Sequence, residues 1–370
     1  MIGSYDYLIV GSGLYGAVFA REMTDLGAKC LVLEKRKHTG GNVFCENIEG
    51  INVHKYGPHI FHTNDKEIWD YVNLHCRFNH FIYSPMANYK GKLYNLPFNM
   101  NTFYQLWKVR TPQEAQERIR AQAPMKQGIN ALNLADHARE MVGTDIFNKF
   151  IKGYTEKQWG RSAKDLPASI IKRLPVRYSF DNNYFDDRYQ GIPIGGYNVL
   201  INCLLKGIEV RTDVDFFSDS TYFSNLAKVI VYTGKLDEYY GYRFGCLEYR
   251  SLSFEHEHYP ISNYQGVAVV NFTERSVPYT RVIEHKHFEF GKQAGTVVTK
   301  EYPEEWRQGK EAFYPINDVS NSLKLKQYQA LAKRESYVIF GGRLAEYKYY
   351  DMHQVIASAL KKVKSLRNLS

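Results

Sequence analysis

Long hydrophobic runs are missing from this chain of 370 residues. No stretch of about 18 apolar residues occurs, so the sequence predicts no membrane-spanning helix and no membrane partner. A strand-like run begins at Tyr5, which leaves no room for a signal peptide before it. We therefore expect a cytoplasmic protein.

Cysteine is scarce, and the five residues present never form a C-x-x-C pair. An odd, scattered set argues against a disulfide framework, a zinc ribbon and a thioredoxin-like redox pair. His256 and His258, like His285 and His287, are two residues apart on expected strands, so each pair should share a face. Because no cysteine or aspartate cluster completes a ligand set, we predict no metal site.

The formal charge of +9 is not gathered into long basic tracts. Nucleic acid is therefore a weak candidate partner, whereas a phosphate-bearing small molecule fits the charge well. An ordinary solvated basic surface explains the same excess. Internal repeats and low-complexity linkers are also missing, which indicates structural units that are interleaved along the chain.

A glycine fingerprint stands close to the N-terminus. Tyr5–Val10 reads as a buried strand, G-x-G-x-x-G follows over residues 11–16, and an amphipathic helix runs to Gly27. A second strand, Lys29–Leu33, ends on Glu34. This order is typical of dinucleotide-binding folds, in which the helix N-terminus receives the pyrophosphate and the acidic residue a ribose. A glycine-rich turn that binds nothing is the alternative.

The rest of the chain divides by its periodicity. Residues 64–173 are mostly helical, with a capped start at Thr111–Glu114 and a hairpin at Tyr89–Tyr94. Residues 175–314 alternate like antiparallel strands, which we place at Leu247–Tyr259, Gly266–Phe272, Tyr279–Phe290 and Thr296–Tyr302. Two segments, Gly195–Val214 and Ala227–Gly234, read as a helix with a strand and as a strand of the first domain.

The C-terminal segment repeats the opening pattern. Tyr337–Phe340 reads as a buried strand, Gly341-Gly342-Arg343 as a tight turn, and Asp351 precedes an amphipathic helix. The positive end of that helix would suit the pyrimidine ring of a reduced flavin. An ordinary unit that closes the sheet is an equally good explanation of the local pattern.

Several longer motifs, in this order along the chain, resemble the bacterial UDP-galactopyranose mutases. They are Gly57-Pro58-His59-Ile60-Phe61-His62-Thr63, Lys152-Gly153-Tyr154-Thr155-Glu156-Lys157-Gln158-Trp159, Arg173-Leu174-Pro175-Val176-Arg177, Asp181-Asn182-Asn183-Tyr184-Phe185, Tyr279-Thr280-Arg281, Gly341-Gly342-Arg343 and Tyr347-Lys348-Tyr349-Tyr350-Asp351-Met352. Together with the fingerprint they cover nearly the whole length.

The resemblance implies an α/β fold with a discontinuous Rossmann-like FAD-binding domain, an inserted helical domain and an antiparallel β-sheet domain. The FAD-binding domain would comprise residues 1–78, 195–235 and 315–370. Residues 79–174 would form the helical domain with a mobile substrate loop, and residues 175–194 and 236–314 the sheet domain. A homodimer is also expected.

The resemblance further implies an FAD enzyme that interconverts UDP-galactopyranose and UDP-galactofuranose without net oxidation. Because the chain offers no evident side-chain nucleophile, N5 of the reduced flavin is expected to hold the sugar covalently, through an iminium, while its ring opens and recloses. Arg173, Arg281 and His59 match the positions expected to act in catalysis. The positions expected at the substrate are Phe150, Tyr154, Thr155, Trp159, Arg173, Tyr184, Asn271, Arg281, Tyr314 and Tyr349. Those expected at the cofactor are Gly11, Gly13, Leu14, Gly16, Glu34, Lys35, Gly41, Asn42, His59, Ile60, Arg343, Tyr349, Asp351 and Met352.

Two other functions compete with this interpretation. An amine-oxidase-like or reductase flavoprotein would share the N-terminal fingerprint, although the second G-x-G-x-x-G of pyridine-nucleotide reductases is missing. A non-catalytic sensor of flavin or nucleotide sugar is the other alternative. Turnover at constant flavin oxidation state separates the mutase from both.

Overall fold

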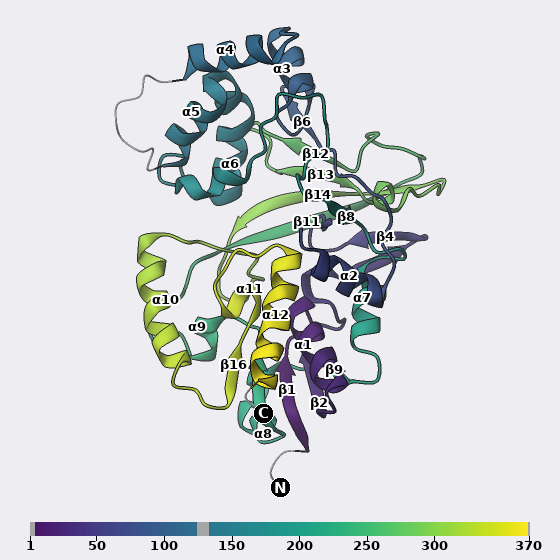
Figure 1. Cartoon of the computed structure of the whole chain (residues 1–370), viewed down its shortest axis with the longest axis vertical. Helices are drawn as coiled ribbons and strands as arrows, with labels where there is room; N and C mark the ends of the chain where they lie inside the picture. The colour runs from purple at the N-terminus through teal and green to yellow at the C-terminus, as the bar shows by residue number, and fades with distance from the viewer. Residues whose placement is uncertain (1–3, 124–132, 369–370) are drawn as a thin grey trace.

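The computed structural model describes residues 4–123 and 133–368, with the backbone alone for residues 172 and 173. Figure 1 shows a small helical unit, a mixed sheet across the middle of the molecule, and a parallel sheet with its helices at the other end. Among the residues described, no helix is long and apolar enough to cross a membrane.

A five-stranded parallel sheet forms the half of the molecule farther from the helical unit. Its strands are, in spatial order, β16 (Val338–Phe340), β10 (Ala227–Tyr232), β1 (Tyr5–Val10), β2 (Cys30–Glu34) and β9 (Glu209–Thr212). Helices α1 (Leu14–Asp25), α7 (Tyr197–Leu204) and α12 (Met352–Arg367) pack together beside it. The strands and helices expected around Tyr5, Lys29, Gly195, Ala227, Tyr337 and Asp351 are thereby confirmed.

Burial on both faces explains why β2 and the second halves of β1 and β10 are almost continuously apolar, whereas the edge strand β9 is polar and more exposed. Ile9 and Val32 point into the core that contains α1 and α12, whereas Leu8, Leu31 and Leu33 point into a second core with Phe216 and Tyr232. Successive residues of a strand face opposite sides, so each short run serves two layers. Because β1, β2 and β10 are adjacent and parallel, their carboxyl ends and the loops that follow them lie side by side.

A seven-stranded mixed sheet joins this half to the helical unit. Its spatial order is β15 (Tyr314–Pro315), β11 (Tyr249–Tyr259), β14 (Thr296–Glu305), β13 (Arg281–Glu284), β12 (Val269–Phe272), β6 (Met86–Tyr89) and β7 (Lys92–Asn95). All neighbours are antiparallel except β12 and β6. The hairpin expected at Tyr89–Tyr94 is present as β6 and β7, and it extends this sheet through the non-local pairing with β12.

One predicted strand is wrong in its second half. Tyr279–Phe290 reads as a single strand, but β13 ends at Glu284 and a 3-10 turn, η5, occupies His285–Glu289. Residues 282–286 are buried in succession instead of alternately, because Glu284, His285 and Lys286 all reach inward to polar partners. His285 and His287 therefore do not share a strand face, whereas His256 and His258 lie together on β11 as expected.

The helical unit consists of α3 (Met100–Trp107), α4 (Pro112–Gln122), α5 (Leu134–Ile146), a π-helical turn η2 (Phe147–Ile151), α6 (Lys152–Trp159) and a 3-10 turn η3 (Ala168–Arg173). Thr111 and Glu114 form the expected capping box at the start of α4. The helical backbone of α5 is interrupted at Gly143, whose φ is 78°. These elements share a core of their own around Phe103, Val142 and Phe147.

The remaining helices, strands and 3-10 turns connect these units. They are β3 (Cys45–Ile48), β4 (Ile51–His54), β5 (Phe61–Thr63), α2 (Lys66–His75), β8 (Tyr189–Gly191), α8 (Ser220–Ser224), α9 (Leu236–Tyr239), α10 (Val319–Ala332), α11 (Gly342–Ala345) and the 3-10 turns η1 (Gly41–Val43) and η4 (Phe216–Ser218). β3 pairs with β4, and β5 with β8.

Candidate active site

The fingerprint glycines form a cradle at the carboxyl end of β1. Gly11 has a φ of 106°, and a Cβ added to it would lie 2.1 Å from Thr233 Oγ1; a Cβ on Gly16 would lie 2.0 Å from the carbonyl oxygen of Gly11. At Gly13 no described atom stands within 4 Å of that position. The outer two glycines are thus needed for packing, and the middle one leaves open space at the N-terminus of α1. This fits a bound pyrophosphate, for which the first N–H groups of the helix are donors.

A cavity of about 260 Å³ surrounds this cradle. Most positions expected at the cofactor line it, and they come from three separate parts of the chain: Gly11, Gly13, Leu14, Gly16, Glu34, Lys35, Gly41, Asn42, His59, Arg343 and Met352. Three others do not. Ile60 is buried, Tyr349 lines a second cavity, and Asp351 forms the N-cap of α12 in a capping box with Gln354.

Glu34 at the end of β2 is buried and already held by the protein. Its carboxylate accepts hydrogen bonds from Ser12 N at 3.0 Å, Ser12 Oγ at 2.6 Å and Arg36 N at 2.9 Å. These bonds fix the side chain beside the glycine turn, and each carboxylate oxygen can accept more than one donor. The orientation suits a ribose hydroxyl.

Arg36 is a cavity residue that sequence reasoning missed. Its guanidinium lies 4.3 Å from the ring centre of Tyr56 and pairs with Glu311 at 2.8 Å. Glu311 comes from a part of the chain 275 residues away, so no local pattern signals this contact. Arg36 and Glu311 line the cavity near the carboxyl end of β2, and Tyr56 packs against the guanidinium.

His59 and Arg343 mark the other end of the smaller cavity. His59 Nδ1 lies 2.8 Å from the carbonyl oxygen of Gly57. Because a carbonyl only accepts, Nδ1 carries the proton, which leaves Nε2 as an acceptor. Burial, followed by the charge of Arg343, lowers the pKa of His59 to about 4, so this imidazole is neutral at physiological pH.

A larger cavity of about 700 Å³ lies between the helical unit and the mixed sheet. Nine of the ten positions expected at the substrate line it: Phe150, Tyr154, Thr155, Trp159, Tyr184, Asn271, Arg281, Tyr314 and Tyr349. The tenth, Arg173, ends η3; its side chain is outside the described part of the structure. Arg343 connects the two cavities, since its guanidinium lies 5.8 Å from the ring of Tyr314 and 5.6 Å from that of Tyr349.

Arg281 is held by the register of the sheet. It stands opposite Asn271 on β12 and opposite Glu301 on β14. Its Nε lies 2.9 Å and a terminal nitrogen 2.8 Å from Glu301 Oε1. Burial works against a charge here, but Glu301 holds the pKa of the Arg281 guanidinium well above its usual value. The site therefore contains a fixed cation.

Partly buried tyrosines supply hydroxyl groups around that cation. Burial raises the pKa of Tyr184 to about 12 and raises the pKa values of Tyr154 and Tyr314 as well. All three stay protonated at neutral pH and can donate hydrogen bonds to an anion. The rings of Tyr314 and Tyr349 stack with their centres 5.5 Å apart.

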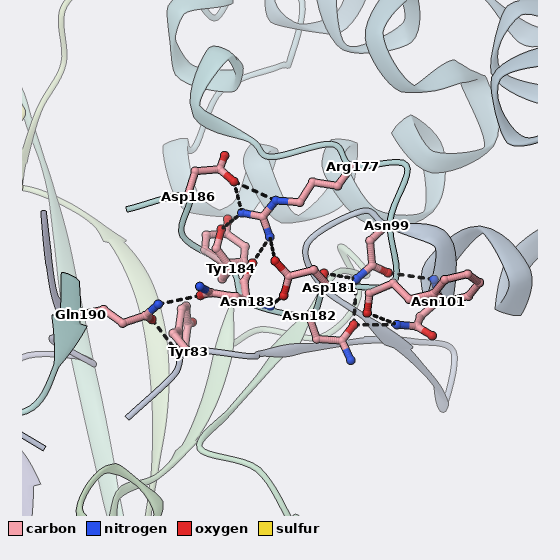
Figure 2. A network of polar contacts seen from close by, with 11 residues as sticks. Tyr83, Asn99, Asn101, Arg177, Asp181, Asn182, Asn183, Tyr184, Asp186 and Gln190 are labelled. Atoms are coloured by element: carbon pink, nitrogen blue, oxygen red, sulfur yellow. Dashed lines mark hydrogen bonds and ion pairs between the residues drawn. The ribbon is translucent and has the colours of Figure 1, made fainter. Parts of the chain in front are cut away.

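Figure 2 shows how the chain places Tyr184. Arg177 donates to the carbonyl oxygens of Asn183 and Tyr184 and pairs with Asp186. Asn99 Nδ2 donates to the carbonyl oxygen of Asp181 at 2.6 Å. The segment around Tyr184 is thereby tied to the helical unit and to the loop after η3.

Comparison with known proteins decides the family. The model of the family described as UDP-galactopyranose mutase matches residues 149–349, and an NAD(P)-binding Rossmann-like domain matches residues 9–73. This chain belongs to the UDP-galactopyranose mutase family. It is therefore an enzyme of an isomerase family.

Two curated relatives align with almost the whole length of this protein. A dTDP-fucopyranose mutase of Escherichia coli is 38% identical, with 96% of both chains covered. A probable UDP-galactopyranose mutase of Klebsiella pneumoniae is 36% identical, covering 96% of this chain and 93% of its own. Among solved structures, a reduced UDP-galactopyranose mutase superposes with a TM-score of 0.76 at 14% identity, over 99% of this chain and 96% of its own. That likeness shows the fold.

The described residues of the two cavities do not form a metal-binding site. Within residues 4–123 and 133–368, no group of three or more His, Cys, Asp or Glu side chains could hold an ion. The imidazole of His256 instead shares Thr299 Oγ1 with that of His285. Both histidines are used in the interior packing of the sheet.

Proposed function

We propose that this protein interconverts UDP-galactopyranose and UDP-galactofuranose with FAD as its cofactor. The observation that supports this best is the larger cavity, where nine of the residues expected at the substrate converge from helix, sheet and C-terminal segment. Arg343 joins that cavity to the glycine cradle, so a sugar and a flavin ring could meet there.

The residues of the smaller cavity fit FAD. Gly13 and the start of α1 would receive the pyrophosphate, Glu34 a ribose, and His59 with Arg343 would lie toward the flavin ring. When reduced and bound, FAD supplies the nucleophile that the chain lacks, its N5 atom, to which the sugar would be joined covalently.

The chain's own contribution is to hold and orient the nucleotide sugar. Arg281 offers a permanent planar cation to the diphosphate, and Arg173 would oppose it from η3. Protonated tyrosines can donate to the phosphate oxygens as negative charge builds on the leaving nucleotide. The apolar wall around Phe150 excludes water from the base.

A second candidate substrate is dTDP-fucopyranose. It is favoured by one observation, the 38% identity to the Escherichia coli enzyme over 96% of each chain. That nucleotide sugar differs from UDP-galactose by a methyl group on the base, a missing 2′-hydroxyl and a missing hydroxyl on the sugar. The reaction, the cofactor and the role of Arg281 would be the same for both.

A direct assay tests the proposal. The FAD-loaded protein is incubated with each nucleotide sugar, with and without dithionite, and the products are separated by chromatography. We expect furanose product only with reduced flavin, whose oxidation state stays constant. Stoichiometric oxidation of the flavin would indicate a redox enzyme, and binding without product would indicate a sensor.

Two further expectations stay predictions. We propose a homodimer, which the molar mass measured by light scattering during gel filtration tests. A cytoplasmic location is tested by fractionation of cells that express the protein with its natural termini.

A further inference from the structure

Lys157 is a partly buried cation that the substrate cavity does not use. It lies on α6, between Glu156 and Gln158, and does not belong to the described residues that line the larger cavity. Its Nζ donates to three carbonyl oxygens, those of Phe272 at 2.8 Å, Val277 at 2.9 Å and Tyr279 at 2.8 Å. An ammonium group has three donors, so this arrangement satisfies it completely.

One carbonyl belongs to Phe272, the last residue of β12, and the other two belong to the turn that leads to β13. Asn271 precedes Phe272 on β12, Arg281 begins β13, and the two face each other across the hairpin. Both line the larger cavity. One side chain therefore ties the strand ends that carry Asn271 and Arg281 to the helix that carries Tyr154, Thr155 and Trp159.

Two neighbouring contacts press the same surfaces together. A Cβ added to Gly153, one turn before Lys157 on α6, would lie 2.5 Å from the carbonyl oxygen of Thr273. From another strand of the same sheet, Arg250 of β11 donates to the carbonyl oxygen of Gln158 at 2.9 Å. Helix α6 is thus fitted closely against the hairpin and the sheet.

We propose that Lys157 is a positioning residue that sets the separation between Arg281 and the α6 wall of the substrate cavity. Burial lowers the pKa of Lys157 to about 8, so the fold keeps a cation where an apolar side chain would be easier to bury. All three of its hydrogen bonds go to residues 272–279, so the ammonium group holds that segment against α6. This inference rests on the proposed function for the consequence in turnover, but the contact itself does not.

Lys286, in the 3-10 turn η5 directly after β13, provides a matched control. Its Nζ also donates to three carbonyl oxygens, those of Ser262 at 2.8 Å, Gln293 at 2.6 Å and Gly295 at 3.0 Å. Among the described residues that line the two cavities, neither Lys286 nor these three partners occurs. Lys286→Met therefore removes the same kind of contact without touching the substrate walls.

The experiment compares Lys157→Met with Lys286→Met in the FAD-loaded protein. Hydrogen–deuterium exchange is followed in peptides that cover residues 269–284, where the Phe272 amide donates to Thr280 within the hairpin and the Thr273 amide donates to Asn88 of β6. We expect faster exchange there in Lys157→Met alone. In the reductive assay, kcat/KM should fall by about tenfold to a hundredfold in Lys157→Met and by less than about threefold in Lys286→Met.

A double-variant cycle with Arg281→Ala separates positioning from general loss of stability. If Lys157 acts through Arg281, then Lys157→Met should add little to the loss already caused by Arg281→Ala. Independent, multiplying losses would overturn the proposal, as would unchanged exchange of the hairpin. If Lys157→Met does not fold, Lys157→Gln, which keeps two N–H donors, is measured in its place. A wild-type protein that converts neither nucleotide sugar would refute the proposed function, while the exchange comparison would still decide the contact.

Discussion

Arg281 and Glu301 stand directly opposite each other on β13 and β14, and Glu301 is fully buried beneath the guanidinium. Glu301 Oε1 also accepts from Thr280 Oγ1 at 3.0 Å, so the carboxylate itself is fixed. Glu301 Oε2 has no hydrogen-bond partner among the described residues. The guanidinium of Arg281 is therefore oriented by a carboxylate that solvent does not reach.

Removal of this cation should slow turnover severely. Arg281→Ala is expected to lower kcat by about 10²–10³, because a charge that strengthens its contact with the departing diphosphate is lost. Steady-state kinetics with dithionite-reduced enzyme measures the effect, and the flavin spectrum serves as the control for cofactor binding. Near wild-type turnover would place Arg281 outside the reaction.

Glu301→Gln should lower turnover, but less than Arg281→Ala does. The amide keeps one oxygen for Arg281 and Thr280 but removes the charge that balances the buried guanidinium. We expect a loss of about tenfold to a hundredfold in kcat/KM, with a smaller fall in melting temperature than in Glu301→Ala, which leaves the guanidinium unpaired. Equal kinetics for Glu301→Gln and wild type would show that the charge of Glu301 is not needed.

The glycine cradle predicts that substitution of Gly13 affects flavin binding, whereas substitution of Gly16 affects stability. Gly13→Val should fold but purify without flavin, because its side chain would enter the open space at the start of α1. Gly16→Val should be strongly destabilised, since even a Cβ would stand 2.0 Å from the carbonyl oxygen of Gly11. Thermal unfolding and the visible absorption spectrum test both. A yellow Gly13→Val protein would contradict the assignment of the cradle.

The parallel sheet and its cofactor turn were readable because their signals are local. The fingerprint, the apolar strands and the caps of α4 and α12 each depend on residues a few positions apart. Arg36 with Glu311, and Lys157 with the turn at residues 272–279, could not be read this way, since their partners are more than a hundred residues distant. The prediction that the strand continues past Glu284 is wrong for the same reason. Buried polar contacts with residues distant in the sequence outweigh the local alternation of apolar and polar residues.

Acid should destabilise the fold through its buried histidines. Burial lowers the pKa of His54 to about 3 and the pKa values of His59 and His256 to about 4. Unfolded imidazoles take up a proton below about pH 6.5 whereas these folded ones do not, so the free energy of unfolding falls as pH drops from there toward 4.

His256 offers a way to measure one member of this set. His256→Asn places an amide oxygen where Nδ1 accepts from Thr299, and it removes one proton from the linkage. The slope of unfolding free energy against pH should decrease by up to about 1.4 kcal/mol per pH unit. Urea unfolding between pH 4.5 and 7.5 measures it, and an unchanged slope would mean that His256 is protonated alike in both states.

The network of Figure 2 predicts that Arg177 acts on the substrate through Tyr184. Arg177→Met releases the carbonyl oxygens of Asn183 and Tyr184 and the partner Asp186. We expect KM for the nucleotide sugar to rise by about tenfold with a smaller change in kcat, because a wall of the cavity loosens while Arg281 stays in place. Arg188→Met, whose guanidinium lies over Tyr189 in the same segment, is the control. Equal kinetics in the two variants would remove Arg177 from this role.

Trp159 should report the arrival of the substrate by fluorescence. It is the tryptophan among the described residues that line the larger cavity, whereas Trp107 bonds to Asp145 in the helical unit and Trp69 stacks on Tyr189. Helix α6 ends at Trp159, and Gly160 follows at a φ of 65°, so the ring stands at the end of the helix. If it covers the uracil, UDP should quench the fluorescence of wild type and of Trp107→Phe alike. Trp159→Phe should lose most of that quenching, and a variant that still quenches fully would show that the ring takes no part in binding.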